Sequence, residues 1–323
     1  MNRIIVAAAL AAGFIAGGIQ TASAEWPSDR PIRLIIGFGA GGGTDIAARI
    51  IAEPLGKLLN TTVVVENKPG AGGTIASEQV ARADKDGYTA SMISTGHTVG
   101  AVMLKAAERY DAVKDFAPVS VVANSTFVVV ANKNFAANDV KGLIALAKAS
   151  PGKLNFASVG VGSTQNMAGE LLVQLAGINV KHIPYRGSPA LVGALLAGEV
   201  DYAVETFPAV QGQVQAGTLK LLGVGSAKRV SGAPDVPTVG EAVPGYAVSG
   251  WYGWVYPAGV PKAVVDKTHA ALKTVLSMPE IREKMSKIGG EAATSTPQEF
   301  TTLLADEVAK WKAVRDKAGM TPK

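Results

Sequence analysis

The strongest constraint on the fold of this chain is a unit that occurs twice, in which a short apolar strand leads into a glycine-rich loop and then into a helix. The first copy covers residues 36–45 and the second covers residues 157–165. Around them, β-rich runs alternate with helical stretches, which is the pattern of an α/β protein whose sheets are mainly parallel. Ligands of open α/β sheets bind at the carboxyl ends of the strands, where both loops are expected.

The alternating elements form two sets that are followed by a helical tail. Strands are expected at 32–36, 62–66, 88–94, 119–122, 126–130, 154–157, 180–183, 200–204 and 219–224, and late helices at 261–276, 279–288 and 296–318. The late helices need a sheet to cover, so we expect the tail to return to the first set. The predicted division is lobe 1, residues 25–124 plus 247–323, and lobe 2, residues 125–246, with a cleft between the lobes and a hinge at the two crossings.

The N-terminus has the pattern of a secretory signal peptide. Arg3 gives a basic start, residues 4–19 are almost uncharged, and Ala22-Ser23-Ala24 forms a small-x-small cleavage site. The apolar run is shorter than the roughly 20 residues that a membrane span needs. We therefore expect cleavage after Ala24 and a mature periplasmic protein that begins at Glu25.

Composition excludes several classes of protein. The chain has no cysteine, so a lipoprotein anchor, disulfides, thiolate zinc sites and cysteine nucleophiles are all excluded. Its formal net charge of +5 favours anionic ligands only weakly. Runs of five or more Lys or Arg are absent from the sequence, and no nucleic-acid footprint is present. We expect a monomer with no membrane anchor, no metal and no cofactor.

The two glycine loops have the features of an anion site. Glycine lets the backbone approach a ligand closely, and the N-terminus of the following helix offers unpaired N–H groups and a partial positive charge. Two such loops that face each other across a cleft would hold a carboxylate from both sides, with the strand end at Thr95 as a third contact. The alternative is that the loops are only tight connections.

Other residues have weaker signals. Glu205, at the end of the strand 200–204, is expected to bind a polar or basic group of the ligand, and the alternative is a solvated strand end. Asp45 is expected to cap a helix. The flat side chains of Tyr185, Phe207, Trp251, Tyr252 and Trp254 suit a cleft wall, although only one or two of them should lie there.

A dinucleotide-dependent oxidoreductase is the main alternative. Residues 37–42 satisfy G-x-G-x-x-G between a strand and a helix, and Glu66 ends the next strand. However, the exported compartment lacks a ready nicotinamide pool, and the single Arg3 is not a twin-arginine start. The histidines His97, His182 and His269 lie far apart, and neither H-E-x-x-H nor G-x-S-x-G occurs. We expect that the chain is not an enzyme.

A series of short motifs runs through nearly the whole mature chain in a specific order. They are PIRLI (31–35), GGGTD (41–45), VVENKPGAGG (64–73), DGYT (86–89), KDFAP (114–118), PYRG (184–187), GEVD (198–201), VPT (236–238), WYG (251–253) and PAGVP (257–261). Together they resemble the Bug (TctC-like) periplasmic solute-binding proteins of tripartite tricarboxylate transporters. Three departures are the looser glycine run at 39–43, Asn166 where a histidine is frequent, and Val204 where an aromatic residue is frequent.

The resemblance implies a two-lobed periplasmic binding protein (Venus flytrap) that closes around a small carboxylate in the interlobe cleft. It implies uptake through the membrane subunits of a tripartite tricarboxylate transporter, and an exported ligand sensor of the same fold is the alternative. Di- and tricarboxylates, amino acids and aromatic acids all fit as ligands. The predicted ligand-binding residues are Phe38, Ala40, Gly42, Gly43, Thr44, Thr95, His97, Gly162, Ser163, Thr164, Gln165, Tyr185, Glu205, Thr206 and Phe207.

Overall fold

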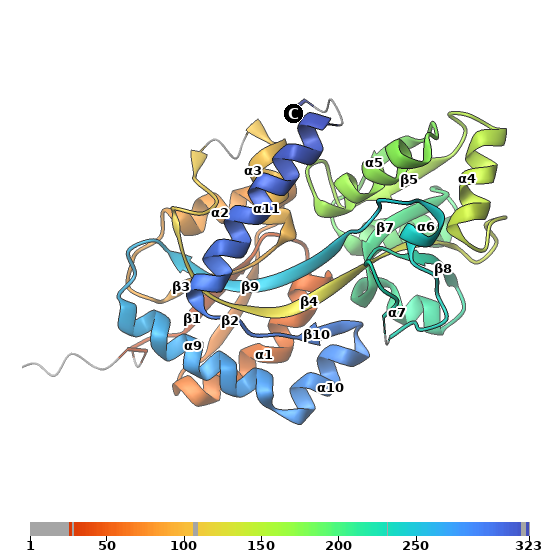
Figure 1. Ribbon diagram of the computed structural model, residues 1–323. Helices are drawn as coiled ribbons and strands as arrows, with labels where there is room; N and C mark the ends of the chain where they lie inside the picture. The colour runs from red at the N-terminus through yellow and green to blue at the C-terminus, as the bar shows by residue number, and fades with distance from the viewer. Residues whose placement is uncertain (1–25, 28, 106–108, 231, 318–320, 323) are drawn as a thin grey trace, which may run out of the picture.

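The computed structural model describes residues 26–27, 29–105, 109–230, 232–317 and 321–322. The predicted signal peptide and its cleavage site lie outside these residues. The described chain forms two lobes that lie side by side (Figure 1). We call them lobe 1 and lobe 2, and each is built on its own part of one mixed sheet with the strand order β2-β1-β3-β9-β4-β7-β5-β6.

Lobe 1 contains the N-terminal and C-terminal thirds of the described chain. Its strands are β1 (Ile32–Ile36), β2 (Val63–Asn67), β3 (Thr89–Ser94), β9 (Ser249–Pro257) and β10 (Gly290–Ala292). Its helices are α1 (Gly43–Leu59), η1 (Ala71–Gly73), α2 (Thr74–Ala81), α3 (Thr95–Met103), α9 (Lys262–Ser277), α10 (Pro279–Lys287) and α11 (Pro297–Lys317). The late helices α9 and α11 pack against this sheet, since their buried residues share clusters with those of β1 and β9.

Lobe 2 is formed by the middle of the chain. Its strands are β5 (Asn155–Ser158), β6 (Lys181–Pro184), β7 (Tyr202–Thr206) and β8 (Leu219–Val224), and its helices are α4 (Val140–Ala149), α5 (Thr164–Ala176), α6 (Ser188–Ala197), α7 (Phe207–Gln215) and α8 (Val239–Ala242). Strands β5, β6 and β7 are parallel, as are β1, β2 and β3 in lobe 1. The predicted α/β class and two-lobed architecture are therefore confirmed, with antiparallel strands at the junction of the lobes.

The long strand β4 (Phe116–Asn132) joins the two lobes. It pairs with β9 up to Thr126, and from Phe127 onward it pairs with β7 and β8. The two separate strands expected at 119–122 and 126–130 are thus one strand. Shifts of register against β9 mark bulges, which bend a strand and increase its twist. Figure 1 shows β4 and β9 running together toward lobe 2.

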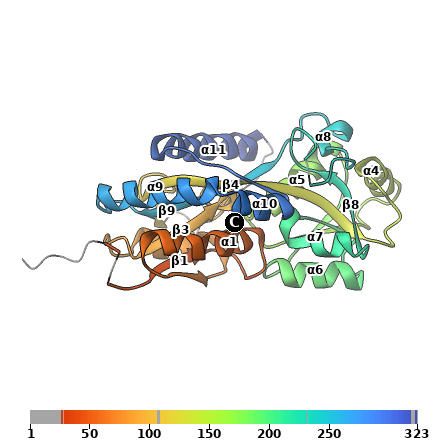
Figure 2. The same ribbon diagram turned by 90° about the horizontal axis from the view of Figure 1, so that it is seen from below.

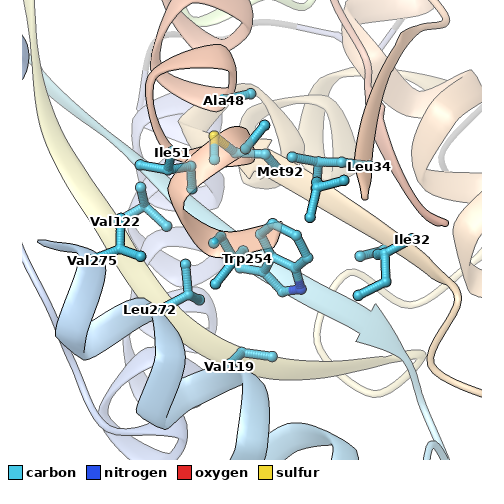
Figure 3. Packing of buried hydrophobic residues seen from close by; sticks show 14 of the residues in the cluster. Ile32, Leu34, Ala48, Ile51, Met92, Val119, Val122, Trp254, Leu272 and Val275 are labelled. Atoms are coloured by element: carbon cyan, nitrogen blue, oxygen red, sulfur yellow. The ribbon is translucent and has the colours of Figure 1, made fainter. Parts of the chain in front are cut away.

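Lobe 1 has helices on both faces of its sheet because its strands are apolar on both faces. In β9, Trp254 is wholly buried in a cluster with Ile51 of α1 and Leu272 of α9 (Figure 3). The alternate residues Trp251 and Val255 pack instead with residues of α2 and α11. Side chains of a strand point alternately to its two faces, so this sequence places one helix layer on each side. Figure 2 shows α11 and α1 on opposite sides of the β4–β9 pair.

Candidate ligand-binding site

A cavity lies where the two lobes meet, and the N-termini of several helices meet at its walls. It contains about 430 Å³ of empty space, including its opening to solvent. Lobe 1 contributes Gly42, Gly43 and Thr44 of α1 and Ser94 and Thr95 of α3, and lobe 2 contributes Thr164 and Gln165 of α5, Gly187 and Ser188 of α6, and Thr206, the residue before α7. This is the arrangement expected of a ligand site in a cleft.

The walls of the cavity carry no Lys, Arg, His, Asp or Glu among the described residues. Its positive potential must therefore come from helix N-termini and oriented N–H groups. Helices α1, α6 and α7 have no side-chain cap, whereas Ser94 and Ser163 cap α3 and α5. In a helix without a side-chain cap, N–H groups of the first turn can donate to a ligand oxygen.

Hydroxyl groups line the part of the cavity nearest the hinge. The Tyr252 hydroxyl lies 2.8 Å from Ser125 Oγ and is also hydrogen-bonded to Thr206. Burial raises the pKa of Tyr252 above its ordinary value, so the phenol is neutral at physiological pH. Tyr252 is in β9, Ser125 is in β4 and Thr206 ends β7, so these three hydroxyls connect the two lobes.

Asp45 is the third residue of α1 and does not cap it, since Gly42 is the N-cap. Its carboxylate accepts hydrogen bonds from Gly41 N at 2.9 Å and Asn67 Nδ2 at 3.0 Å, and it pairs with Arg49. Burial opposes its ionisation, but the hydrogen bonds from Arg49, Gly41 and Asn67 outweigh burial and hold the pKa of Asp45 below its ordinary value. Asp45 was expected to cap the helix; instead, it stabilises the first glycine loop through its hydrogen bond to Gly41.

Glu205 is wholly buried, so the alternative of a solvated strand end is wrong. Its Oε1 accepts hydrogen bonds from Gln165 Nε2 at 3.0 Å, Thr206 N at 2.6 Å and Thr206 Oγ1 at 3.2 Å. Its Oε2 has no hydrogen-bond partner in the described part of the chain. Burial raises the pKa of Glu205, and these hydrogen bonds oppose that effect. Glu205 lies behind the cavity wall, since Gln165 and Thr206 line the cavity and Glu205 does not.

The structure brings about half of the predicted ligand-binding residues together. Those that line the cavity are Phe38, Gly42, Gly43, Thr44, Thr95, Thr164, Gln165 and Thr206. Among the others, Ala40 is exposed and Ser163 caps α5. Tyr185 lines a wider opening beside the cavity, together with Gly160 and Val161, which precede Gly162 in the chain. Phe207 packs on Gly289, where an added Cβ would lie 1.9 Å from its ring.

His97 lies outside the cavity wall and is fully buried. Its Nδ1 is 2.8 Å from Ser77 Oγ and its Nε2 is 2.9 Å from the carbonyl oxygen of Ala112. Burial lowers the pKa of His97 to about 4, so the ring is neutral at physiological pH. His182 and His269 also have hydrogen-bond partners, Ser158 Oγ and the carbonyl of Ser295. No group of His, Asp and Glu in the described ranges is arranged to hold a metal ion.

Several residues of the wall were not predicted. They are Gly39, Ser94, Ser125, Phe127, Val159, Gly187, Ser188 and Gly250, and two of the named aromatic residues, Trp251 and Tyr252, join them. Gly187 and Ser188 repeat the strand–glycine–helix pattern, so the same signal could have found them. Ser125 has no comparable signal, because its place in the wall depends on where β4 passes from lobe 1 to lobe 2. Trp254 is in the core of lobe 1.

Glu66, which ends the second strand of the dinucleotide alternative, has another partner. Glu66 pairs with Arg33 through both carboxylate oxygens, at 2.7 and 2.9 Å, and these hydrogen bonds lower the pKa of Glu66. Both of its oxygens are thus already hydrogen-bonded.

In the part of the chain that the structure describes, no helix combines the length and apolar character needed to cross a membrane.

Comparisons with known proteins identify the family to which this chain belongs. Residues 47–320 match the model of the tripartite tricarboxylate transporter family receptor. The periplasmic binding protein BugD is 34% identical with a TM-score of 0.87, over 91% of this chain and 99% of BugD. Two proteins from Rhodopseudomonas palustris are also similar. Rpa4515, solved with adipate, is 30% identical with a TM-score of 0.88, over 92% of this chain and 100% of that one.

The second is MatC, solved with bound malate, which is 29% identical with a TM-score of 0.83, over 88% of this chain and 99% of MatC. The family match covers most of the chain, and the structures match nearly their whole length. The chain therefore belongs to the tripartite tricarboxylate transporter family receptors, which are Bug-type periplasmic solute-binding proteins.

Proposed function

We propose that this chain captures a small carboxylate between its lobes and delivers it to the membrane subunits of a tripartite tricarboxylate transporter. The observation that carries the proposal is the meeting of helix N-termini from both lobes at a cavity without charged side chains in its described wall. A carboxylate suits such a cavity because N–H groups and hydroxyls can surround it. Adipate in Rpa4515 and malate in MatC are both small carboxylates.

Neutral donors are sufficient for useful affinity. Each hydrogen bond to a charged group contributes roughly 1.5–3 kcal/mol net. A few such bonds reach the about −8 kcal/mol that corresponds to a micromolar dissociation constant. Neutral donors also avoid the desolvation of a buried cation, which costs several kcal/mol.

Closure of the lobes links capture to delivery. Walls from both lobes contact the ligand together only when the lobes are closed, so the ligand shifts the population toward the closed form. We propose that the moving bodies are residues 25–124 plus 247–323 and residues 125–246. The membrane subunits would recognise the closed form. The proposed mature protein is a periplasmic monomer without a membrane anchor, released by cleavage after Ala24.

A thermal-shift screen of the protein from Glu25 onward tests the proposal. The panel contains di- and tricarboxylates, amino acids and aromatic acids, with NAD and NADP as the competing class. A ligand at 100 times its dissociation constant adds about 2.7 kcal/mol. For a chain of this size each kcal/mol raises the Tm by roughly 2–4 °C, so we expect a shift of about 5–10 °C with a carboxylate. A shift with NAD alone, or none with any carboxylate, would contradict the proposal.

A further inference from the structure

The hydrogen bonds around Glu205 fix which way the polar groups of lobe 2 point. Glu205 Oε1 accepts from Gln165 Nε2 and from Thr206 N, which can only donate, so this oxygen acts as an acceptor. Gln165 Nε2 and Thr206 Oγ1 donate to Glu205 Oε1, at 3.0 and 3.2 Å. Gln165, Ser188 and Thr206 all line the cavity.

This orientation leaves acceptors on the lobe 2 side of the cavity. A threonine hydroxyl has one donor and two acceptor lone pairs, so the Thr206 hydroxyl, which donates to Glu205, has only lone pairs left for a ligand. The Tyr252 hydroxyl, which is also bonded to Thr206, can donate to that oxygen and continue the same direction. The cavity therefore has N–H donors at the N-terminus of α1 in lobe 1 and a hydroxyl acceptor beside Glu205 in lobe 2.

Charge strengthens this asymmetry. Glu205 is wholly buried, and no Lys, Arg or His among the described residues forms an ion pair with it. Its Oε2 has no hydrogen-bond partner there. A buried carboxylate without a cation is costly, which raises the pKa of Glu205, and an ammonium group nearby would stabilise its ionised form. A dianion in the cavity would instead favour the protonated, neutral form.

We propose that the ligand is an amino acid, with a protonated amine beside its carboxylate, and that Glu205 selects it. Glu205 is a positioning residue, since it acts through Gln165 and Thr206 and through its charge. The carboxylate of the ligand lies at the N-terminus of α1, and its ammonium group donates to the Thr206 hydroxyl of lobe 2. The inference rests on the proposed function, because it names the carboxylate that the cleft captures.

Three matched series of ligands test it by titration calorimetry on the chain from Glu25 onward. They are alanine, lactate and propionate; aspartate, malate and succinate; and glutamate, 2-hydroxyglutarate and glutarate. Within a series the members differ mainly in an ammonium, a hydroxyl or a hydrogen at one carbon. In the series that fits the cavity, we expect the amino acid to bind about tenfold or more tighter than the hydroxy acid, and the unsubstituted acid to bind weakest.

A variant separates the role of Glu205 from general damage to the fold. In Glu205→Gln the preference for the amino acid over the hydroxy acid should fall by about tenfold, because the negative charge is lost. The matched control is Glu307→Gln, which changes another buried glutamate, bonded to Trp311 Nε1 in α11. It should keep the wild-type preference. A loss of stability alone would weaken all members of a series together.

Each other outcome contradicts a different statement. Equal or tighter binding of the unsubstituted acid in every series would overturn the inference and leave carboxylate capture intact. An amino-acid preference that survives in Glu205→Gln would overturn the role of Glu205. A failure of all nine ligands and of the wider carboxylate panel would overturn the proposed function itself. The wild-type series stands as a test even if Glu205→Gln does not fold.

Discussion

Gly43 lies so close to Tyr252 that a Cβ atom built on the glycine would be 2.2 Å from the phenolic oxygen. The same Cβ would be 2.8 Å from Thr206 Oγ1. Gly43 is the first residue of α1 in lobe 1, whereas Thr206 ends β7 in lobe 2. The glycine is therefore required by the close approach of the two lobes at the helix N-terminus, and this approach closes the cavity on the hinge side.

Gly43→Ala should weaken ligand binding. The new methyl group must displace Tyr252 or Thr206, and such overpacking typically costs about 1–3 kcal/mol. We expect a comparable loss of stability in urea unfolding and a dissociation constant that rises by about tenfold or more, because the displaced groups line the cavity. Gly212→Ala in α7 is the control, since an added Cβ there meets no atom within 4 Å. Wild-type affinity in Gly43→Ala would show that this contact does not shape the site.

Gly162→Ala tests a second contact between the lobes. Gly162 has φ +77°, and an added Cβ would lie 2.6 Å from Leu104 of lobe 1. Gly177 is the matched control, because it has φ +60° with no atom within 4 Å of an added Cβ. Alanine in the left-handed region costs about 1–2 kcal/mol, so both variants should lose similar stability from backbone strain. Only Gly162→Ala should also lose ligand affinity. Thermal unfolding measures the loss of stability and calorimetry measures the loss of affinity. Equal affinities of the two variants would contradict a role of the Gly162–Leu104 contact in closure.

The sequence predicted the parts of the site that depend on local signals. The glycine runs between a strand and a helix predicted that Gly42, Gly43 and Thr164 lie in the wall, because the local sequence alone indicates backbone freedom and the start of a helix. The fold class followed from the same alternation. The late helices were also placed correctly to within a residue or two.

Parts of the structure that depend on tertiary packing were not predicted. Helix α3 begins at Thr95, and helix α7 begins at Phe207, which is followed by Pro208. Neither helix was predicted, because poor helix formers such as Gly96 lie in their first turns. Strand β9 was missed because the tail was expected to be wholly helical. Ser125 lies in the wall only because β4 continues unbroken from one lobe to the other.

Buried His97 predicts a loss of stability in acid. Its pKa of about 4 lies below the ordinary value of 6.5, so the unfolded chain binds the proton more tightly than the native protein. The stability is thus fully present above pH 6.5 and is lost as the pH falls toward 4, by roughly 3 kcal/mol. Urea unfolding between pH 7.5 and 4.5 measures this change. His97→Gln should be less stable at neutral pH but flatter across the range, and an unchanged slope would contradict the burial argument.

Glu205 predicts a pH dependence of the opposite sign. Burial raises its pKa above the ordinary value, so the native protein holds this proton more tightly than the unfolded chain does. Its contribution to stability is present at acid pH and is lost as the pH rises through the raised pKa. Glu205→Gln cannot titrate, so its unfolding free energy minus that of the wild type should become more positive from pH 4.5 to 7.5 in the absence of ligand.

The comparison with Glu205→Gln isolates this one group. His97 is present in both proteins, so its loss of stability in acid cancels in the difference between them. Urea unfolding of both proteins at several pH values gives that difference directly. A difference that stays constant with pH would mean that the hydrogen bonds to the carboxylate offset its burial completely. In that case the pKa of Glu205 would be the same in the native protein and in the unfolded chain, so the carboxylate would be ionised at pH 7.5 and its charge would face the ammonium of an amino-acid ligand there.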